Sequence, residues 1–151
     1  MRVVLADAPG GGAGAAIVAP LLHVMGQTWS SNFWANVQTD GVHKGYYKSD
    51  ERYEPICLHE GPGPHEVPVV HSAVAIDLRQ PSTLALGWQA KTGDGTFDAN
   101  LPADDVVAFG LIARHVGAKQ VVLNDRVYGF MLDTLAEAET YAERDAHWAA
   151  L

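Results

Sequence analysis

The sequence predicts a single α/β domain in which a mixed sheet is flanked by helices. Three segments carry this prediction. Residues 67–78 show the period-two pattern of a strand, and residues 102–116 have a proline at the start and a glycine after the end, as helices often do. Residues 120–124 form a short apolar strand directly after that helix. Long irregular stretches separate these elements, so repeated βαβ units are not expected.

Two short apolar segments, residues 2–6 and 17–20, are predicted strands at the start of the chain. A glycine-rich connector lies between them. Gly10, Gly12 and Ala15 fit the pattern G-x-G-x-x-A, but a dinucleotide-binding fold needs a full helix after the glycines. Because a second strand follows instead, we expect the glycine-rich segment to be a flexible connector and not a nucleotide-binding loop.

Residues 27–53 are rich in aromatic and polar side chains and show no sustained period of 2 or 3.6. The aromatic residues are Trp29, Phe33, Trp34, Tyr46, Tyr47 and Tyr53. An ordered loop of this kind either packs its rings as a small satellite core or offers flat faces to a ligand such as a sugar. The sequence leaves both alternatives open.

Residues 59–66, HEGPGPHE, contain two His-Glu pairs but are predicted to form a turn. A zinc site of the His-Glu-x-x-His type requires a helix to bring both imidazoles to one face. The two glycines and two prolines of this segment exclude such a helix.

Residues 67–78 form the clearest predicted strand, with a bulky apolar face and a face of small residues. The second face also carries His71 and Asp77, as expected of a strand that forms the floor of a binding cleft. The alternative is that both side chains bond to nearby backbone. A catalytic pair of His71 and Ser72 is not expected, because neighbours on a strand point to opposite faces.

Helix 102–116 places Asp104 and Asp105 in its first turn. Carboxylates are stabilised there by the helix dipole, which is a sufficient structural reason for both. The functional alternative is that one of them accepts a proton as a general base. After the strand at 120–124 come a turn, a short segment at 127–131, and a helix predicted over residues 134–148.

The composition limits which classes of partner the chain is expected to bind. Its 151 residues are 48% hydrophobic, and 18 acidic against 10 basic residues give a net charge of -8. Nucleic acid and anionic membranes are therefore not expected partners. Cys57 is the only cysteine, which excludes an intrachain disulfide. The first apolar stretch is too short for a secretory signal, so the sequence looks cytosolic or incomplete.

Several segments together resemble one protein family. They are IVAPLL, SNFW, GYYK, VPVVHSAVAIDLR, the helix start at Asp104 and Asp105, and NDRVYGF. In order and spacing they resemble the procollagen galactosyltransferases of glycosyltransferase family 25, from about residue 17 to about residue 143. Residues 1–16, the glycine-rich start, match poorly. The resemblance implies that residues 1–151 form one partial domain, the later half of a GT-A-like nucleotide-diphospho-sugar transferase fold.

The resemblance also implies an activity. Members of this family transfer galactose from UDP-galactose to hydroxylysine in collagen-like sequences, with inversion at the sugar carbon and with Mn as the metal ion. Their Asp-x-Asp motif holds the metal and the diphosphate. Asp7 corresponds to one of its aspartates, and Pro9 occupies the second position. The family implies the lumen of the endoplasmic reticulum, although this chain shows no signal peptide.

The family pattern carries over to particular residues. Asp104 and Asp105 match its late acidic pair, in which one carboxylate acts as base toward the acceptor hydroxyl. The residues that match the wall of its sugar or acceptor cleft are Asn32, Trp34, Tyr46, Tyr47, His71 and Ser72.

Two functions follow from the resemblance. The chain is either part of a working glycosyltransferase, incomplete as it stands, or a non-catalytic GT-A-like accessory or interaction domain. Half of such a sheet would also leave one edge unpaired, which predicts self-association.

Overall fold

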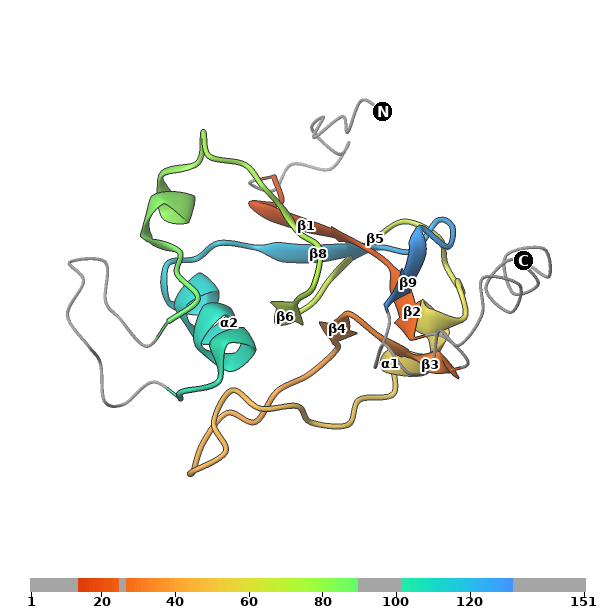
Figure 1. The fold of residues 1–151 in the computed structure, drawn as a ribbon, viewed down its shortest axis with the longest axis horizontal. Coiled ribbons are helices and arrows are strands. Elements are labelled where there is room, and N and C mark those ends of the chain that lie inside the picture. Colours follow the sequence, from red (N-terminus) through yellow and green to blue (C-terminus); the bar gives the residue numbers. More distant parts are fainter. Residues whose placement is uncertain (1–13, 25–26, 90–101, 132–151) are drawn as a thin grey trace.

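The structure, a computed structural model, describes residues 14–24, 27–89 and 102–131 (Figure 1). It confirms the mixed α/β class, with small mixed sheets and few helices. The predicted strand at 2–6, the predicted helix at 134–148 and Asp7 lie outside the described residues. In the described part of the chain, no helix has the length and apolar character needed to cross a bilayer.

A four-stranded sheet forms the centre of the fold, in the order β5-β8-β1-β7. Strand β1 (Ile17–Pro20) pairs in parallel with β8 (Gln120–Leu123). Strands β5 (Pro64–Glu66) and β7 (Ala75–Ile76) add antiparallel edges on either side. The predicted strands at 17–20 and 120–124 are therefore confirmed and lie side by side. Self-association through a sheet edge stays a prediction.

Two smaller sheets flank this centre (Figure 1). Strand β2 (Leu22–Val24) pairs with β3 (Gln27–Ser31) and in parallel with β9 (Gly129–Met131). Strand β4 (Phe33–Trp34) pairs with β6 (Val69–Val70). The stretch without clear period in the sequence thus contains two short strands. They are too short for alternation to be visible, because a period needs several residues to show.

The prediction of one continuous strand over residues 67–78 is wrong. Two short stretches within it form β6 and β7, which belong to different sheets. Between them Ser72 has a φ of 67°, and the N–H of Ala73 donates to the carbonyl of His71 at 2.8 Å. A non-glycine residue at positive φ reverses the chain locally, so the period-two pattern does not continue in space.

The segment at 59–66 begins as the predicted turn and ends as an edge strand. The short helix α1 (Tyr53–Cys57) precedes it, and Gly61 has a φ of 66°. Residues 64–66 then form β5 against β8. The strand forms because its register partners on β8 supply backbone hydrogen bonds that the local sequence does not reveal.

The predicted helix is confirmed as α2 (Asp105–His115). Asp104 is its N-cap, and the Asp104 carboxylate accepts a hydrogen bond from the N–H of Val107 at 3.1 Å. Gly117 follows the helix with a φ of 71°, which is a conformation that glycine adopts without strain. A 3₁₀ helix, η1 (Pro81–Ala85), lies between β7 and α2 in the chain.

The hydrophobic core joins the central sheet to α2 and the β4–β6 pair. Phe109 of α2 and Phe33 of β4 are both fully buried. The Phe33 ring stacks on Tyr53 at 4.9 Å, and the Phe109 ring stacks on Trp88 at 3.9 Å. The remaining core comes mainly from small aliphatic residues, including Ile17, Ala19, Leu21, Val70, Ala113 and Val122.

Helix α2 lies close against β6 at Gly110. A Cβ placed there would lie 2.6 Å from Cγ2 of Val69. Val69 is buried and β-branched, so its methyl group has no free direction in which to move. The close approach of helix and strand therefore depends on the missing side chain.

The side chain of Asn32 connects all three sheets. Its Oδ1 accepts from the N–H of Leu22 at 2.8 Å and from the Ser31 hydroxyl at 3.2 Å. Its Nδ2 donates to the carbonyls of Pro20 at 2.9 Å and of His71 at 3.3 Å. The Asn32 carbonyl also accepts from the N–H of His71 at 2.9 Å. Asn32 therefore ties the β1–β2 junction to the turn after β6.

Substituting Gly110→Ala should destabilise the protein by about 1–2 kcal/mol, because overpacking against Val69 outweighs the gain in helix propensity. In a Val69→Ala background the same change should be neutral or stabilising. Urea unfolding of the four proteins of this cycle measures both effects, with Gly87→Ala as a control that meets nothing within 4 Å. Equal destabilisation in both backgrounds would contradict the close contact.

Substituting Asn32→Ala should cost about 2–4 kcal/mol of stability, because it leaves several buried backbone groups without their partner. Asn36→Ala is the matched control, since half-buried Asn36 accepts from the N–H of Val37 and hydrogen-bonds the exposed ion pair at Asp50 instead of the sheet backbone. Thermal and urea unfolding would compare the two variants. A loss for Asn32→Ala no larger than that for Asn36→Ala would refute the connecting role.

Candidate functional site

The structure brings several predicted site residues together beside the start of α2. The Trp34 ring lies 6.3 Å from the ring of Tyr47 and 6.3 Å from that of His71. Tyr47 is 46% exposed, so this group of rings faces solvent. Together with Ser72 and Asp104 these residues form what we call the His71 cluster. Strand β4 supplies Trp34, the turn after β6 supplies His71 and Ser72, and the N-cap of α2 supplies Asp104.

His71 and Ser72 contact each other directly. Nδ1 of His71 lies 2.9 Å from Oγ of Ser72. The prediction that these neighbours point apart is wrong, because the positive φ of Ser72 replaces the expected strand with a turn. The strained position and the hydrogen bond give the hydroxyl a defined orientation next to the imidazole.

Asp77, in contrast, does not share a site with His71. It follows β7, and its Oδ1 lies 2.8 Å from Nε of Arg79. The side-chain hydrogen bonds from Arg79 lower the pKa of Asp77 to about 2. The predicted common face of His71 and Asp77 is wrong for the same reason as the continuous strand.

Two opposing effects act on His71. Burial lowers its pKa below 6.5, and the nearby charge of Asp104 partly offsets this by raising it. The imidazole is therefore neutral near pH 7 and can accept a proton. Because the unfolded chain protonates this residue more readily, its contribution to stability falls as the pH drops below 6.5 toward the lower folded pKa.

The two aspartates at the helix start differ in their surroundings. The carboxylate of Asp104 caps the helix through one oxygen and also acts electrostatically on His71. Asp105 is exposed in the first turn, and no contact joins it to the cluster in the described part of the chain. Of the predicted acidic pair, Asp104 is thus the member that faces the His71 cluster.

Asn32 and Tyr46 lie differently from the other predicted cleft residues. Asn32 is 0% exposed, so it could affect a substrate only indirectly, by holding the backbone of His71. The Tyr46 ring packs against His43 at 6.1 Å and makes no ring contact with the cluster among the described residues. The substrate-binding role of both stays a prediction.

Two other groups bear on the chemistry. Cys57 is buried, and burial raises the pKa of its thiol to about 11, which suits a packing residue better than a nucleophile. Within residues 14–24, 27–89 and 102–131, no three His, Cys, Asp or Glu side chains are placed to hold a metal ion. The described residues alone therefore do not form the manganese site that the sequence led us to expect.

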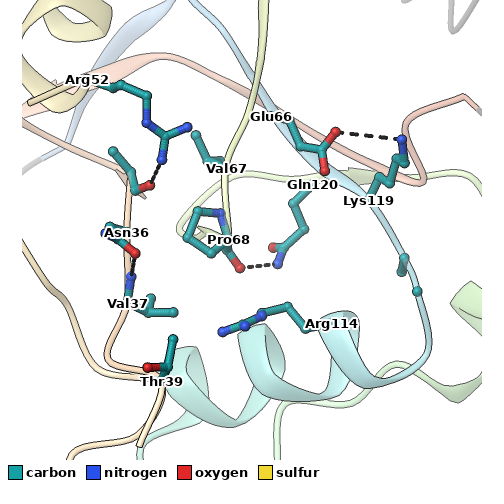
Figure 2. A pocket seen from close by; sticks show the side chains of 13 residues that line it. Asn36, Val37, Thr39, Arg52, Glu66, Val67, Pro68, Arg114, Lys119 and Gln120 are labelled. Carbon is teal, nitrogen blue, oxygen red and sulfur yellow. Dashed lines mark hydrogen bonds and ion pairs between the residues drawn. The ribbon is translucent and has the colours of Figure 1, made fainter. Parts of the chain in front are cut away.

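A pocket of about 510 Å³ opens elsewhere on the molecule (Figure 2). It lies between the segment after β4, the β5–β6 connection and the end of α2. Its charged lining consists of Arg52, Glu66, Arg114 and Lys119, and its apolar lining includes Val37, Val67 and Pro68. The pocket shares no residue with the His71 cluster.

Sequence reasoning missed the cations of this pocket. Arg52, Arg114 and Lys119 come from three separate segments, so they form no basic run in the chain. The only local signal is Arg114, which stands in the last helical turn where a cation is favoured by the helix dipole. That position has a sufficient structural explanation, and only folding brings it opposite Arg52.

Comparison with known proteins gives a consistent result. The sequence profile of "Glycosyltransferase family 25, N-terminal domain" matches residues 13–148. A "Glycosyltransferase 25 family member" of Anopheles gambiae is 32% identical over 130 residues, which are 85% of this chain and 21% of the relative. The human "Procollagen galactosyltransferase 2" is 32% identical over 127 residues, or 84% of this chain and 19% of the relative.

A further relative carries a different description. The bovine "Probable inactive glycosyltransferase 25 family member 3" is 30% identical over 118 residues, which are 78% of this chain and 18% of that protein. The chain thus spans about a fifth of the length of the relatives that it matches.

Substituting Asp104→Asn should lower the pKa of His71 further, because it removes the negative charge that favours the imidazolium. Asparagine is also a good N-cap, so α2 should remain intact. NMR titration of the His71 ring would measure the change, with Asp105→Asn as the matched control. An unchanged or raised pKa in Asp104→Asn would show that the two groups do not interact.

Proposed function

Because the chain belongs to glycosyltransferase family 25, we propose that it takes part in transferring galactose from UDP-galactose to hydroxylysine in collagen-like acceptors. The single observation that carries this proposal is the family match over residues 13–148. The similarity to procollagen galactosyltransferases supports galactose as the sugar and collagen as the acceptor. On the same basis we propose a GT-A-like fold for the complete transferase domain.

We assign the His71 cluster to the acceptor side of this reaction. Exposed Tyr47 and half-buried Trp34 provide aromatic surface for the carbon skeleton of a sugar or a side chain. Neutral His71 and the Ser72 hydroxyl provide polar contacts at the base of these rings. An acceptor hydroxyl bound there would lie near the carboxylate of Asp104.

The proposed chemistry is an in-line displacement with inversion. The acceptor oxygen forms a bond to the anomeric carbon while the bond from that carbon to the diphosphate breaks. Asp104 takes the hydroxyl proton as general base, and the electron pair leaves with the diphosphate. The cap hydrogen bond from the N–H of Val107 holds one carboxylate oxygen in place and leaves the other free to accept the proton.

Manganese would supply charge neutralisation of the leaving diphosphate in such a reaction. Asp7 is the residue that we propose as a ligand, although it lies outside the described residues. The described residues do not by themselves complete a metal site.

A second candidate is a non-catalytic domain of the same family. The similarity to a relative described as inactive favours it, together with Pro9 at the second position of the metal-binding motif. Such a domain would keep an acceptor-binding face without a donor site. The two candidates therefore differ in donor binding and share acceptor binding.

Calorimetric titration of the full chain with UDP-galactose, with and without Mn, would distinguish the transferase from the non-catalytic domain. The transferase proposal expects saturable binding that Mn strengthens, and galactosyl addition to a hydroxylysine-containing collagen peptide detected by mass spectrometry. Asp104→Asn should then reduce transfer by about 10²–10⁴-fold, as expected for loss of a general base, and Asp105→Asn should reduce it much less.

One outcome would overturn the transferase proposal, and another would overturn the role assigned to Asp104. Peptide binding without donor binding by a folded, monodisperse sample would favour the non-catalytic domain. Transfer that is unaffected by Asp104→Asn would refute the assignment of the base.

A further inference from the structure

We propose that the pocket lined by Arg52, Arg114 and Lys119 binds a small organic phosphate, through a dianionic phosphate monoester group. This inference goes beyond galactosyl transfer, because the pocket shares no residue with the His71 cluster. Its volume of about 510 Å³ lies in the range of small-molecule sites.

The charge of the lining favours an anion. Three of its side chains are cationic and one, Glu66, is a carboxylate, in a chain whose net charge is -8. Nζ of Lys119 lies 3.7 Å from Oε2 of Glu66, so the charges of these two side chains nearly cancel. Asp50 forms an ion pair with Arg52 from outside the lining, so the charge of Arg114 is the one left unpaired among the described residues of the pocket. A phosphate monoester group offers three terminal oxygens to the guanidinium donors on the two walls, whereas a carboxylate offers only two.

Arg114 is the main free cation of the pocket. Among the described residues, no hydrogen bond or ion pair engages its guanidinium group. Figure 2 shows its side chain extending from α2 across the pocket, toward the side formed by Val37 and Thr39. A planar guanidinium with unused donors is well suited to bind two phosphate oxygens at once.

Arg52 is held in a fixed position on the opposite wall. Its Nε donates to Oδ1 of Asp50 at 2.9 Å, and its Nη2 donates to the carbonyl of Ala35 at 2.5 Å. These contacts leave Nη1 without a partner among the described residues. A preorganised donor loses little side-chain entropy when an anion binds.

The rest of the lining suits the organic part of the ligand. Val37, Val67 and Pro68 form an apolar surface near the two guanidinium groups (Figure 2). Gln120 lies at the base, but its side chain is already bonded to the backbone of Pro68 and Val70. Specificity would therefore come from charge and apolar contact, and inorganic phosphate should bind more weakly than an organic ester.

Phenyl phosphate is a suitable probe, because it joins a dianion to a compact apolar ring. NMR titration of the full chain should give saturable shifts at the amides of Val37, Arg114 and Lys119. Arg114→Gln should weaken binding at least about tenfold, as expected for loss of charge-assisted hydrogen bonds. Arg126→Gln is the matched control, since exposed Arg126 loses the same charge outside the pocket. It should leave the affinity unchanged.

Two further probes test the ligand class. Benzoate, which has the same ring and one negative charge, should bind at least about tenfold more weakly than phenyl phosphate. Inorganic phosphate should also bind more weakly. The proposal is overturned by an absence of saturable shifts, by equal losses in Arg114→Gln and Arg126→Gln, or by equal affinity for benzoate. None of these readouts depends on galactosyl transfer, so the two proposals can fail separately.

Discussion

The arrangement of this fold depends on one buried amide, that of Asn32. A buried polar side chain is tolerated only when its donors and acceptors are bonded, and Asn32 meets this condition through four side-chain hydrogen bonds. Its partners come from the end of β1, the start of β2 and the turn after β6. The three small sheets therefore cannot shift independently. The same bonds fix the backbone of His71, so the candidate site takes its geometry from the junction of the sheets.

Helix α2 is the second constraint, and its two ends contribute to different parts of the surface. The N-terminal end carries Asp104, which caps the helix and acts on His71. The C-terminal end carries Arg114, which extends into the pocket. The helix dipole favours a carboxylate at the first position and a cation at the second. Gly110 lets the middle of the helix lie directly against β6, and this contact sets the position of both ends.

The two candidate sites consequently differ in chemical character. The His71 cluster combines a neutral imidazole, a hydroxyl and a carboxylate with aromatic faces, which suits a neutral hydroxyl-bearing ligand. The pocket combines guanidinium groups with aliphatic side chains, which suits an anion. The two sites lie apart because opposite ends of α2 contribute to them, Asp104 to the cluster and Arg114 to the pocket.

The sequence by itself determined the features that depend on neighbours along the chain. These are the mixed α/β class, the strands at 17–20 and 120–124, the helix with its cap at Asp104, the turn near Gly61, and the family resemblance. Capping, turn chemistry and the resemblance all rest on patterns that can be read directly from the residues. Tertiary structure alone decided the break at Ser72, since only the pairing of β6 and β7 with different sheets requires a positive φ there. It also decided the contact of His71 with Ser72, the interior position of Asn32, and the presence of Arg52 and Arg114 in one pocket. These features depend on pairing and packing between segments far apart in the sequence, and no local pattern records such contacts.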